Sequence, residues 1–349
     1  MMVRRVQMSG KLKVGIIGCG GRGNAHAQGY KASNDVEIVA CADPVREKAE
    51  AMAEKFGIPH IYEDYRQMLD KEKPDIVSVC TWTGLHARMI FDAVDAGVRA
   101  IHAEKPMAPT WGESKAICER CKSNNVMITF CHQRRFEARF IRAKELAHDG
   151  TIGQLYRVEG YCSNLFDWGT HWFDMFFFYN DDQPAKWVMG QIDCSEVRKV
   201  FGVPVERYGL SYIVWQNGLT GLLVTGGDGS GICQNRLIGT KGIIEVGVPK
   251  GPALRVLSEG KEWVVPNLSD ITPPHNATVL SVLDLIDALK TGREPELSGR
   301  KALQATELIF ATYESARRRA RIYLPLDIED SPLLSMLESG VVGPEKRTS

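Results

Sequence analysis

A short apolar run that passes directly into glycines near the N-terminus constrains the fold of this chain more than any other feature. Residues 14–18 are strand-like, and Gly18, Gly20 and Gly23 have G-x-G-x-x-G spacing ahead of a helix-like segment. In a dinucleotide-binding unit, the first glycine makes the tight turn, the second lets the backbone approach a pyrophosphate, and the third lets helix and strand pack closely. The free N–H groups of the new helix then bind the phosphate. Because glycine turns after strands are common, the rest of the chain has to supply the context.

Residues 11–130 alternate strand-like runs with longer helical patterns, which is the signature of β-α-β units and a parallel sheet. Ligands bind outside the carboxyl ends of such strands, and Asp43, Thr81 and Lys105 fall at those ends. The expected strands are residues 14–18, 36–42, a short piece near 61, 75–80, 99–103 and 126–130. The expected helices are residues 23–32, 46–56, 65–69, 86–96 and 112–123.

Beyond about residue 134, alternating apolar and polar runs are typical of antiparallel strands. Asn217-Gly218, between two of these runs, is a strong signal for a two-residue hairpin. The expected strands are residues 155–161, 186–192, 210–215, 220–225, 235–239, 243–246 and 254–257. The expected helices are residues 137–148, 167–179, 277–290 and 300–318.

Length and charge narrow the class of protein. A chain of 349 residues is too long for one ordinary core and suggests two domains. Basic and acidic residues each number 43, so the net charge is zero and no domain-wide basic field points to nucleic acid. No run is long enough to span a bilayer, and residues 1–10 lack the apolar region of a secretory signal. We expect loose tails at residues 1–10 and 343–349.

Several reactive side chains are best interpreted as structural. The nine cysteines are scattered through apolar strands and helices, which predicts reduced thiols, no disulfides and a cytoplasmic location. Cys118 and Cys121 form a C-x-x-C inside a predicted helix with no second pair nearby, which favours packing over zinc or redox chemistry. We expect His26, His86 and His102 to be satisfied structural histidines.

Asp43 is the acidic residue that follows the second predicted strand. A carboxylate at this position accepts hydrogen bonds from the adenosine ribose hydroxyls, and it repels a 2′-phosphate, which favours NAD over NADP. Arg46 lies close enough to soften that preference. The alternative is that Asp43-Pro44 starts a turn and caps the following helix.

Lys105 lies between Glu104 and Pro106, directly after a predicted buried strand. A lysine there can donate to a substrate hydroxyl and stabilise an alkoxide. The alternative is that Glu104 and Lys105 form a structural pair in a strand-to-helix connection. Loops at strand ends carry function disproportionately, so both interpretations stay open at this point.

Residues 167–174 form a third cluster, Asp-Trp-Gly-Thr-His-Trp-Phe-Asp. In a helix, this spacing places Asp167, His171 and Asp174 on one stripe. A histidine flanked by carboxylates is a candidate general base because its ring is oriented and its proton affinity is tuned. Alternatively, Asp167 caps the helix or the three residues hold a metal ion. No further clustered ligands follow in the sequence, and we predict no metal.

Three motifs in this order make the chain resemble the Gfo/Idh/MocA family of oxidoreductases, which includes glucose-fructose oxidoreductase and inositol dehydrogenase. They are the glycine turn, Glu-Lys-Pro at 104–106, and Asp-x-Gly-x-His-x-x-Asp at 167–174. The resemblance extends over about residues 11–326. It includes Gln-Arg-Arg-Phe at 133–136, Gly-Thr-Lys-Gly at 239–242, Tyr-Glu-Ser-Ala at 313–316 and Leu-Pro-Leu at 324–326.

The resemblance implies an α/β N-terminal Rossmann domain and an α+β C-terminal domain with a large, open, mostly antiparallel sheet. In the family that sheet often mediates dimers or tetramers. We therefore predict a dinucleotide-binding Rossmann domain over residues 10–132, a substrate-binding and oligomerisation domain over residues 133–330, and a C-terminal tail over residues 331–349.

The resemblance also implies roles for individual residues. In similar enzymes the lysine matching Lys105 binds the reacting hydroxyl, the histidine matching His171 acts as acid and base, and the aspartate matching Asp167 contacts substrate or tunes the histidine. The predicted cofactor-binding residues are Gly18, Gly20, Gly21, Arg22, Gly23, Asp43, Arg46, Thr81, Trp82, His86, Glu104 and Lys105. The predicted substrate-binding residues are Arg134, Trp168, Trp172 and Asp174.

Two departures from the family pattern affect the expected contacts. Relatives usually have Thr-Pro-Asn where this chain has Thr-Trp-Thr at 81–83, near the expected pyrophosphate and nicotinamide ribose. The usual glycine pair before the aspartate is replaced by Asn-Leu-Phe at 164–166, and Trp168 and Trp172 flank the proposed base. Aromatic faces suit the apolar side of a sugar or cyclitol ring.

We therefore expect an NAD-preferring dehydrogenase that oxidises a secondary hydroxyl of a sugar, cyclitol or related polyol, or reduces the ketone. His171 would take the hydroxyl proton and Lys105 would stabilise the developing alkoxide. One alternative is an NAD-dependent glycosidase or lyase that oxidises its sugar transiently. Another is a non-catalytic NAD or sugar sensor, which the intact Lys105 and His171 disfavour. The expected partners are a small carbohydrate-like substrate and copies of the same chain, as a homodimer or homotetramer, without nucleic acid or membrane.

Overall fold

The computed structural model describes residues 10–227 and 232–344, and these divide into two compact units. The first unit contains residues up to 108 together with 113–133 and 275–303, and the second contains residues 109–112, 134–274 and those from 304 onward. The sequence boundaries assign 275–303 to the second domain, whereas the contacts assign them to the first unit. The reason is close packing, since a Cβ added to Gly29 would lie 2.6 Å from the side chain of Val282.

The first unit is built on a six-stranded parallel sheet. β4 and β5 are buried along their whole length, which is expected where helices cover both faces of a parallel sheet. In spatial order the strands are β3 (His60–Tyr62), β2 (Val36–Ala42), β1 (Leu12–Ile17), β4 (Ile76–Val79), β5 (Ala100–Ala103) and β6 (Met127–Phe130). This is the predicted Rossmann order, with the switch between β1 and β4.

Local signals set the ends of several helices around this sheet. α2 stops at Gly57, whose φ of +63° is in the left-handed region that favours glycine. The side chains of Asp64 and Asn276 accept backbone N–H groups at the starts of α3 and α8. The helical segments are α1 (Gly21–Lys31), α2 (Arg46–Phe56), α3 (Tyr65–Glu72), the short η1 (Thr83–Leu85), α4 (His86–Asp95), α5 (Trp111–Ser123), η2 (Gln133–Phe136) and α8 (Ala277–Thr291).

The second unit is built on an eight-stranded mixed sheet. Its central neighbours β7 and β12 run parallel, and the other neighbouring pairs run antiparallel, as predicted for the C-terminal domain. The order is β15 (Leu254–Ser258), β14 (Gly242–Val246), β13 (Asn235–Gly239), β7 (Leu155–Cys162), β12 (Thr220–Thr225), β11 (Tyr208–Trp215), β8 (Ala185–Asp193) and β16 (Ile322–Tyr323).

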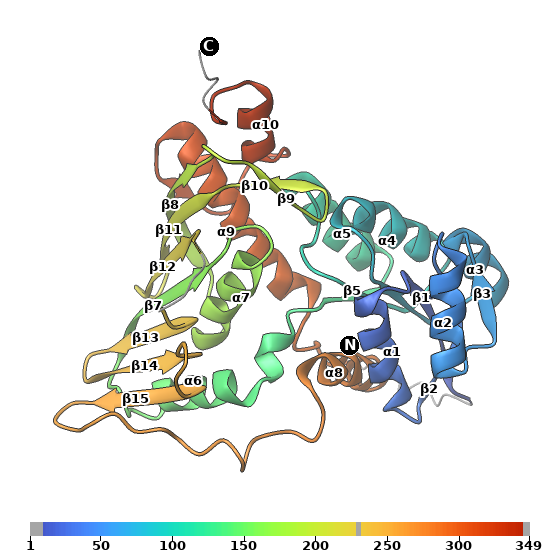
Figure 1. Ribbon diagram of the computed structural model, residues 1–349, viewed down its shortest axis with the longest axis horizontal. Coiled ribbons are helices and arrows are strands. Elements are labelled where there is room, and N and C mark those ends of the chain that lie inside the picture. The colour runs from blue at the N-terminus through green and yellow to red at the C-terminus, as the bar shows by residue number, and fades with distance from the viewer. Residues whose placement is uncertain (1–9, 228–231, 345–349) are drawn as a thin grey trace. The chain divides into compact units, whose positions relative to one another are not determined.

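Helix α7 (Gly169–Tyr179) is the core element of this unit, because every one of its residues is buried. It packs on β7 and β12, and α6 (Ala138–His148) packs on β13 and β14 of the same sheet (Figure 1). The rings of Phe176 and Phe177 meet Trp215 of β11 with centroids 6.4 and 5.6 Å apart. These phenylalanines therefore belong to the core. The remaining helices are α9 (Gly299–Arg318) and α10 (Pro332–Glu338).

The structure differs from the sequence predictions in three short elements. A hairpin of β9 (Arg198–Val200) and β10 (Val203–Val205) was not predicted, because strands this short carry no periodicity. The predicted tail over 331–349 contains α10. The loop at Asn217-Gly218 spans 216–218 rather than two residues, since Trp215 N–H donates to Leu219 O.

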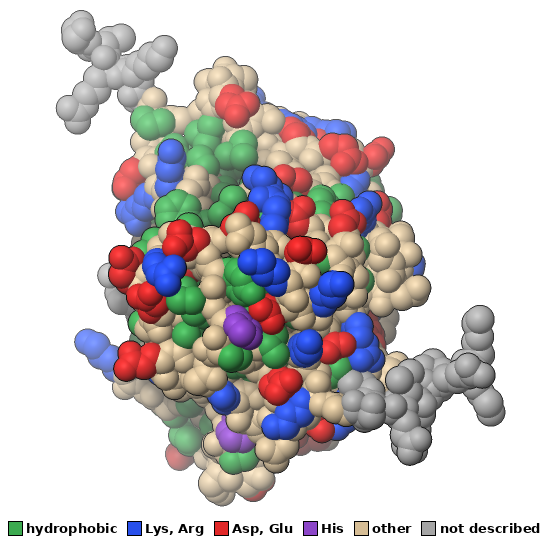
Figure 2. Space-filling view, turned by 90° about the vertical axis from the view of Figure 1, so that its right-hand side faces the viewer, with side chains coloured by type: hydrophobic (Ala, Val, Ile, Leu, Met, Phe, Trp, Pro, Cys, Tyr) green, Lys and Arg blue, Asp and Glu red, His purple; other side chains and the backbone are tan. Residues whose placement is uncertain are grey.

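The state of the cysteines and the distribution of surface charge agree with what the composition indicates. The nine cysteines are all free. No helix in the described part of the chain combines the length and the apolar character needed to cross a membrane. Acidic and basic side chains are interspersed on the face shown in Figure 2, as the balanced charge implies. The tails expected at 1–10 and 343–349 lie mostly outside the described residues.

Candidate cofactor and active site

The glycine turn between β1 and α1 has the form that a pyrophosphate-binding turn requires. Gly18 has a φ of +94°, and a Cβ there would lie 2.4 Å from Cys80 O. A Cβ on Gly23 would lie 2.0 Å from Gly18 O, whereas a Cβ on Gly20 would meet no atom within 4 Å. The first and third glycines are therefore required by backbone packing, and the second leaves open space. The turn fits a dinucleotide.

A cavity of about 420 Å³ lies next to this turn within the first unit. It is formed at the carboxyl ends of β1, β2 and β4, where ligands of such sheets bind. Of the predicted cofactor-binding residues, those that line it are Gly18, Gly20, Asp43, Thr81 and Trp82. Those outside its lining are Gly21, Arg22, Gly23, Arg46, His86, Glu104 and Lys105.

Sequence reasoning missed several residues that line this cavity. Tyr65 begins α3, and Leu85 and Met89 lie in the segment that follows β4. Trp82 is 66% exposed, so its ring is available to a ligand. Tyr65, Leu85 and Met89 lie in segments that follow strands, so a systematic search of the residues after each predicted strand would have found them.

Asp43 has features of both roles that its sequence position left open, a contact with the cofactor and a turn before the next helix. Its Oδ2 accepts the N–H of Cys19 in the glycine turn at 2.9 Å, and its Oδ1 accepts the N–H of Val45 at 2.9 Å. The carboxylate therefore fixes the glycine turn and its own turn while lining the cavity. Arg46 is held by Glu50 at 2.8 Å and by Glu63 at 3.3 Å. These two carboxylates offset the Arg46 charge, which was expected to soften a preference for NAD.

Glu104 is the centre of a buried network beneath the glycine turn. Its Oε1 accepts the Nε–H of Arg22 at 2.6 Å and lies 3.0 Å from Nε2 of His26. Burial by itself raises the pKa of the Glu104 carboxyl, but His26 and Arg22 outweigh burial and lower that pKa to about 2. Glu104 is therefore an anion, and it connects α1 to the residue before Lys105.

Three buried side chains in the same region, His26, His102 and Cys131, bring their ligand atoms within 4.8 Å of one another. His26 Nδ1 lies 3.1 Å from Ser78 Oγ. His102 contacts hydroxyls with both nitrogens, Thr129 Oγ1 at 2.7 Å and Ser281 Oγ at 3.2 Å. Burial lowers the pKa of His102 well below its usual value. These contacts fit the interpretation of His26 and His102 as structural histidines.

His86 also faces backbone rather than the cavity. Its Nδ1 lies 3.0 Å from Pro106 O, and its Nε2 lies 3.1 Å from Thr81 O. Burial lowers the pKa of its ring, although the hydrogen bonds with these carbonyls act to raise it. His86 therefore ties the segment after β4 to the Glu-Lys-Pro turn. Lys105 lies in that turn, directly beyond β5, and is partly buried.

The second unit contains the predicted acid–base segment. α7 begins at Gly169, so Asp167 precedes the helix and the predicted helical stripe is wrong at that residue. Asp167 is 7% exposed, and its N–H donates to Asn164 Oδ1 at 2.6 Å. Trp168 rather than Asp167 occupies the N-cap position of the helix. His171 lies in the first turn and is 4% exposed.

Asp174, predicted as a substrate contact, is bound inside the unit. Its carboxylate accepts Arg135 Nη2 at 2.8 Å and Arg135 Nε at 3.0 Å. Arg135 also donates to Asp182 at 2.8 Å. Burial by itself lowers the pKa of Arg135, but the two carboxylates raise it well above its usual value. Because Asp174 is 1% exposed, we exclude it from the proposed substrate contacts.

The two tryptophans differ in exposure. Trp172 is 1% exposed and donates from Nε1 to Tyr161 O at 2.8 Å, so it belongs to the core. Trp168 is 40% exposed, and its ring lies 6.2 Å from the His171 ring. The Arg134 guanidinium lies 5.5 Å from the Trp168 ring and also pairs with Glu137. Trp168 is the predicted substrate contact with an available aromatic face.

Comparisons with known proteins agree with this geometry. Residues 12–132 match the model of a family described as "Oxidoreductase family, NAD-binding Rossmann fold". A D-glucoside 3-dehydrogenase from Escherichia coli is 31% identical over 44% of this chain, and the match spans 44% of that relative. The scyllo-inositol 2-dehydrogenase (NAD(+)) of Bacillus subtilis is 26% identical over 91% of this chain and 97% of its own length.

Solved structures share the fold across both units. An aldose-aldose oxidoreductase from Caulobacter crescentus superimposes with a TM-score of 0.77. Its sequence is 22% identical, and the match covers 90% of this chain and 100% of that chain. At this identity the likeness supports the fold.

Proposed function

The chain belongs to the Gfo/Idh/MocA family of oxidoreductases, and we propose that it is an NAD-dependent dehydrogenase. It oxidises a secondary hydroxyl of a sugar, cyclitol or related polyol, or it reduces the corresponding ketone. The observation that carries this proposal is the partly buried ion pair of Arg22 with Glu104, at 2.6 Å. It joins the turn that fits NAD to the residue directly before Lys105.

Each proposed role follows from the chemistry of one side chain. NAD, when bound, supplies the two-electron acceptor for the substrate carbon. Gly20 leaves space for the pyrophosphate, and Asp43 faces the cavity with a charge that repels a 2′-phosphate. The Lys105 ammonium stabilises the developing alkoxide, and His171 takes up the hydroxyl proton. Asp167 orients that imidazole or contacts the substrate, and Trp168 offers its face to the ring.

We further propose that the enzyme is a cytoplasmic homodimer or homotetramer. Nine free cysteines suit a reducing compartment. The face of the sheet formed by alternate residues of β11, β12 and β8 carries apolar side chains, including Leu210, Tyr212 and Met189. Leu210 is 44% exposed and Met189 is 50% exposed, which suits a surface that a second copy covers.

The proposal is tested by offering a panel of sugars, inositols and keto-sugars with NAD or NADP and following the absorbance of the reduced nicotinamide. We expect at least one compound to give net NADH with NAD preferred. Release of an aglycone without accumulation of NADH would support a glycosidase or lyase instead. Tight NAD binding without turnover across the panel would support a sensor.

A further inference from the structure

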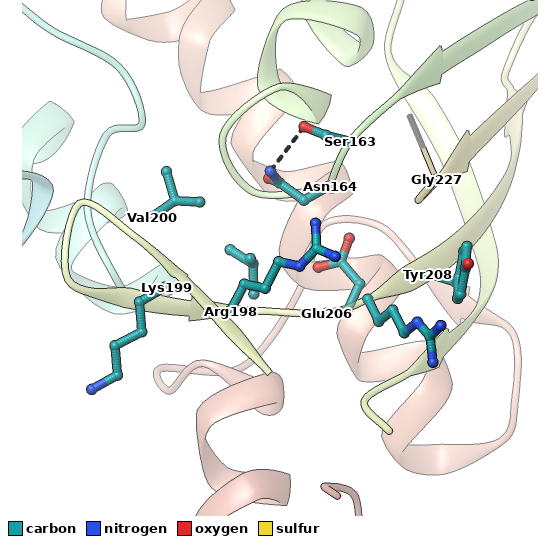
Figure 3. A pocket seen from close by; sticks show the side chains of 10 residues that line it. Ser163, Asn164, Arg198, Lys199, Val200, Glu206, Tyr208 and Gly227 are labelled. Carbon is teal, nitrogen blue, oxygen red and sulfur yellow. Dashed lines mark hydrogen bonds between the residues drawn. The ribbon is translucent and has the colours of Figure 1, made fainter. Parts of the chain in front are cut away.

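A second large cavity, of about 700 Å³, lies within the second unit. It is formed by the β9–β10 hairpin, the start of β11 and the residues that follow β7 (Figure 3). Neither the family pattern nor the proposed acid–base pair accounts for this cavity. Its lining includes the cationic side chains of Arg198, Lys199 and Arg207.

The two arginines keep donors available for a ligand. Arg198 Nε lies 3.0 Å from one oxygen of Glu196, and Arg207 Nε lies 3.9 Å from the other. Arg207 also donates from Nη1 to Ser195 Oγ at 3.2 Å. Each guanidinium has five N–H donors, so one shared carboxylate leaves most of them unused. In Figure 3 the Arg198 guanidinium points toward Asn164, whereas Lys199 extends away from it.

The carboxyl group of Glu206 lies in the cavity wall but is directed into the protein. Its Oε1 accepts the N–H of Leu165 at 2.6 Å and the hydroxyl of Thr225 at 3.0 Å, and its Oε2 accepts the hydroxyl of Tyr313 at 2.7 Å. Burial raises the pKa of Glu206. Glu206 is 1% exposed, and both of its carboxylate oxygens accept hydrogen bonds from groups inside the protein.

Asn164 connects the cavity to the proposed acid–base segment. It lines the cavity, and its side-chain oxygen accepts the N–H of Asp167 at 2.6 Å. Its backbone oxygen accepts the N–H of Gly169 at 2.8 Å. Its Nδ2 donates to Ser163 Oγ at 3.3 Å, as the dashed line in Figure 3 shows. A ligand in the cavity would therefore adjoin the residues that lead into α7.

We propose that this cavity binds an acidic group of the sugar-like substrate, either a carboxylate or a phosphate, through Arg198 and Arg207. The inference rests on the proposed function and specifies its substrate class. Forked guanidinium donors match the oxygens of carboxylate and phosphate. Ser163 and Asn164 add polar groups to the wall, and Tyr208, which is 44% exposed, adds an aromatic side.

The test compares Arg198→Gln and Arg207→Gln with Lys199→Gln. This control removes a neighbouring positive charge whose side chain extends away from Asn164 (Figure 3). Glucose, glucuronate and glucose 6-phosphate are the probes. The binding constant of each is measured by calorimetry with NAD present, and turnover is followed as NADH. We expect an acidic probe to bind more tightly than glucose. Arg198→Gln and Arg207→Gln should weaken binding of the acidic probe about 10- to 100-fold and raise its KM.

In the same experiment, Lys199→Gln should leave binding of the acidic probe within about twofold. Arg198→Lys retains the charge and should recover part of the affinity, which separates charge loss from misfolding. The stronger of the two acidic probes identifies carboxylate or phosphate as the recognised group. Equal effects on glucose and the acidic probes, or no effect of either arginine variant, would overturn the inference and leave the dehydrogenase proposal intact. Acid binding that needs Arg198, without NADH from any compound, would instead contradict the dehydrogenase.

Discussion

Arg22 of α1 donates from Nε to Glu104 Oε1 over 2.6 Å, so the helix that follows the glycine turn is bonded to the residue before Lys105. Arg22 Nη2 also lies 3.2 Å from Cys131 Sγ, just beyond β6. The cofactor turn and the Glu-Lys-Pro turn are thereby held as one body. Changes at Glu104 should consequently affect NAD binding and catalysis together.

The first prediction concerns Glu104→Gln, which preserves shape and removes the charge. Arg22 and His26 lose a charged acceptor, so we expect the free energy of unfolding at neutral pH to fall by about 1–3 kcal/mol. The affinity for NAD and kcat should fall together. Urea unfolding and NAD titration measure the two effects. Unchanged stability with unchanged NAD affinity would show that the network does not hold the turn.

The second prediction is a pH dependence that follows from the same group. The pKa of Glu104 is lowered from 4.5 to about 2 in the folded protein, so its stabilising contribution is fully present above pH 4.5. That contribution is lost as the pH falls toward 2. Unfolding midpoints measured between these values should therefore drop less steeply for Glu104→Gln than for the wild type. Parallel curves would contradict the assignment.

The third prediction separates two glycines of the same turn. Gly20→Ala should fold with a stability within about 0.5 kcal/mol of wild type, because its Cβ meets open space, and should weaken NAD binding at least about tenfold. Gly18→Ala should instead lose several kcal/mol, because its φ is +94° and its Cβ would lie 2.4 Å from Cys80 O. Thermal unfolding and NAD titration of both variants provide the comparison. Gly20→Ala with full NAD affinity would place the cofactor elsewhere.

The fourth prediction tests the structural role of Asp174. Asp174→Asn leaves the buried Arg135 with weaker compensation from Asp182, so we expect a loss of roughly 3 kcal/mol of stability. Trp168→Ala, on an exposed ring, should change stability little and raise KM for the sugar. If Asp174→Asn unfolded like the wild type and raised KM, Asp174 would be the substrate contact that the sequence suggested.

The order of the motifs along the chain predicted most of the fold. The prediction succeeded where short-range sequence signals determine the ends of strands and helices. β2 and α2 have the predicted bounds because the strand is followed by a turn at Asp43-Pro44 and the helix is stopped by Gly57. Asp43 and Thr81 were located because the topology of a parallel sheet fixes where strand ends meet. Such residues can be found without knowledge of their neighbours.

The candidate site was harder to predict wherever a side chain binds a partner that is distant in the sequence. Asp174 was placed on a helical stripe with Asp167, but the helix starts beyond Asp167 and the carboxylate binds Arg135, 39 positions earlier. The cavity around Arg198 had no signal, because its hairpin strands are too short for periodicity. In each case the tertiary fold decides which of several polar partners a side chain meets.

The most direct test of the central claim is the steady-state rate of NAD reduction by Lys105→Met and His171→Asn with the best sugar or cyclitol from the panel. We expect both variants to fold and to bind NAD within a few-fold of wild type. We expect kcat to fall at least about 100-fold in each, because Lys105→Met loses the cation beside the alkoxide and His171→Asn loses the base. Turnover by either folded variant at the wild-type rate would contradict the proposed roles of Lys105 and His171.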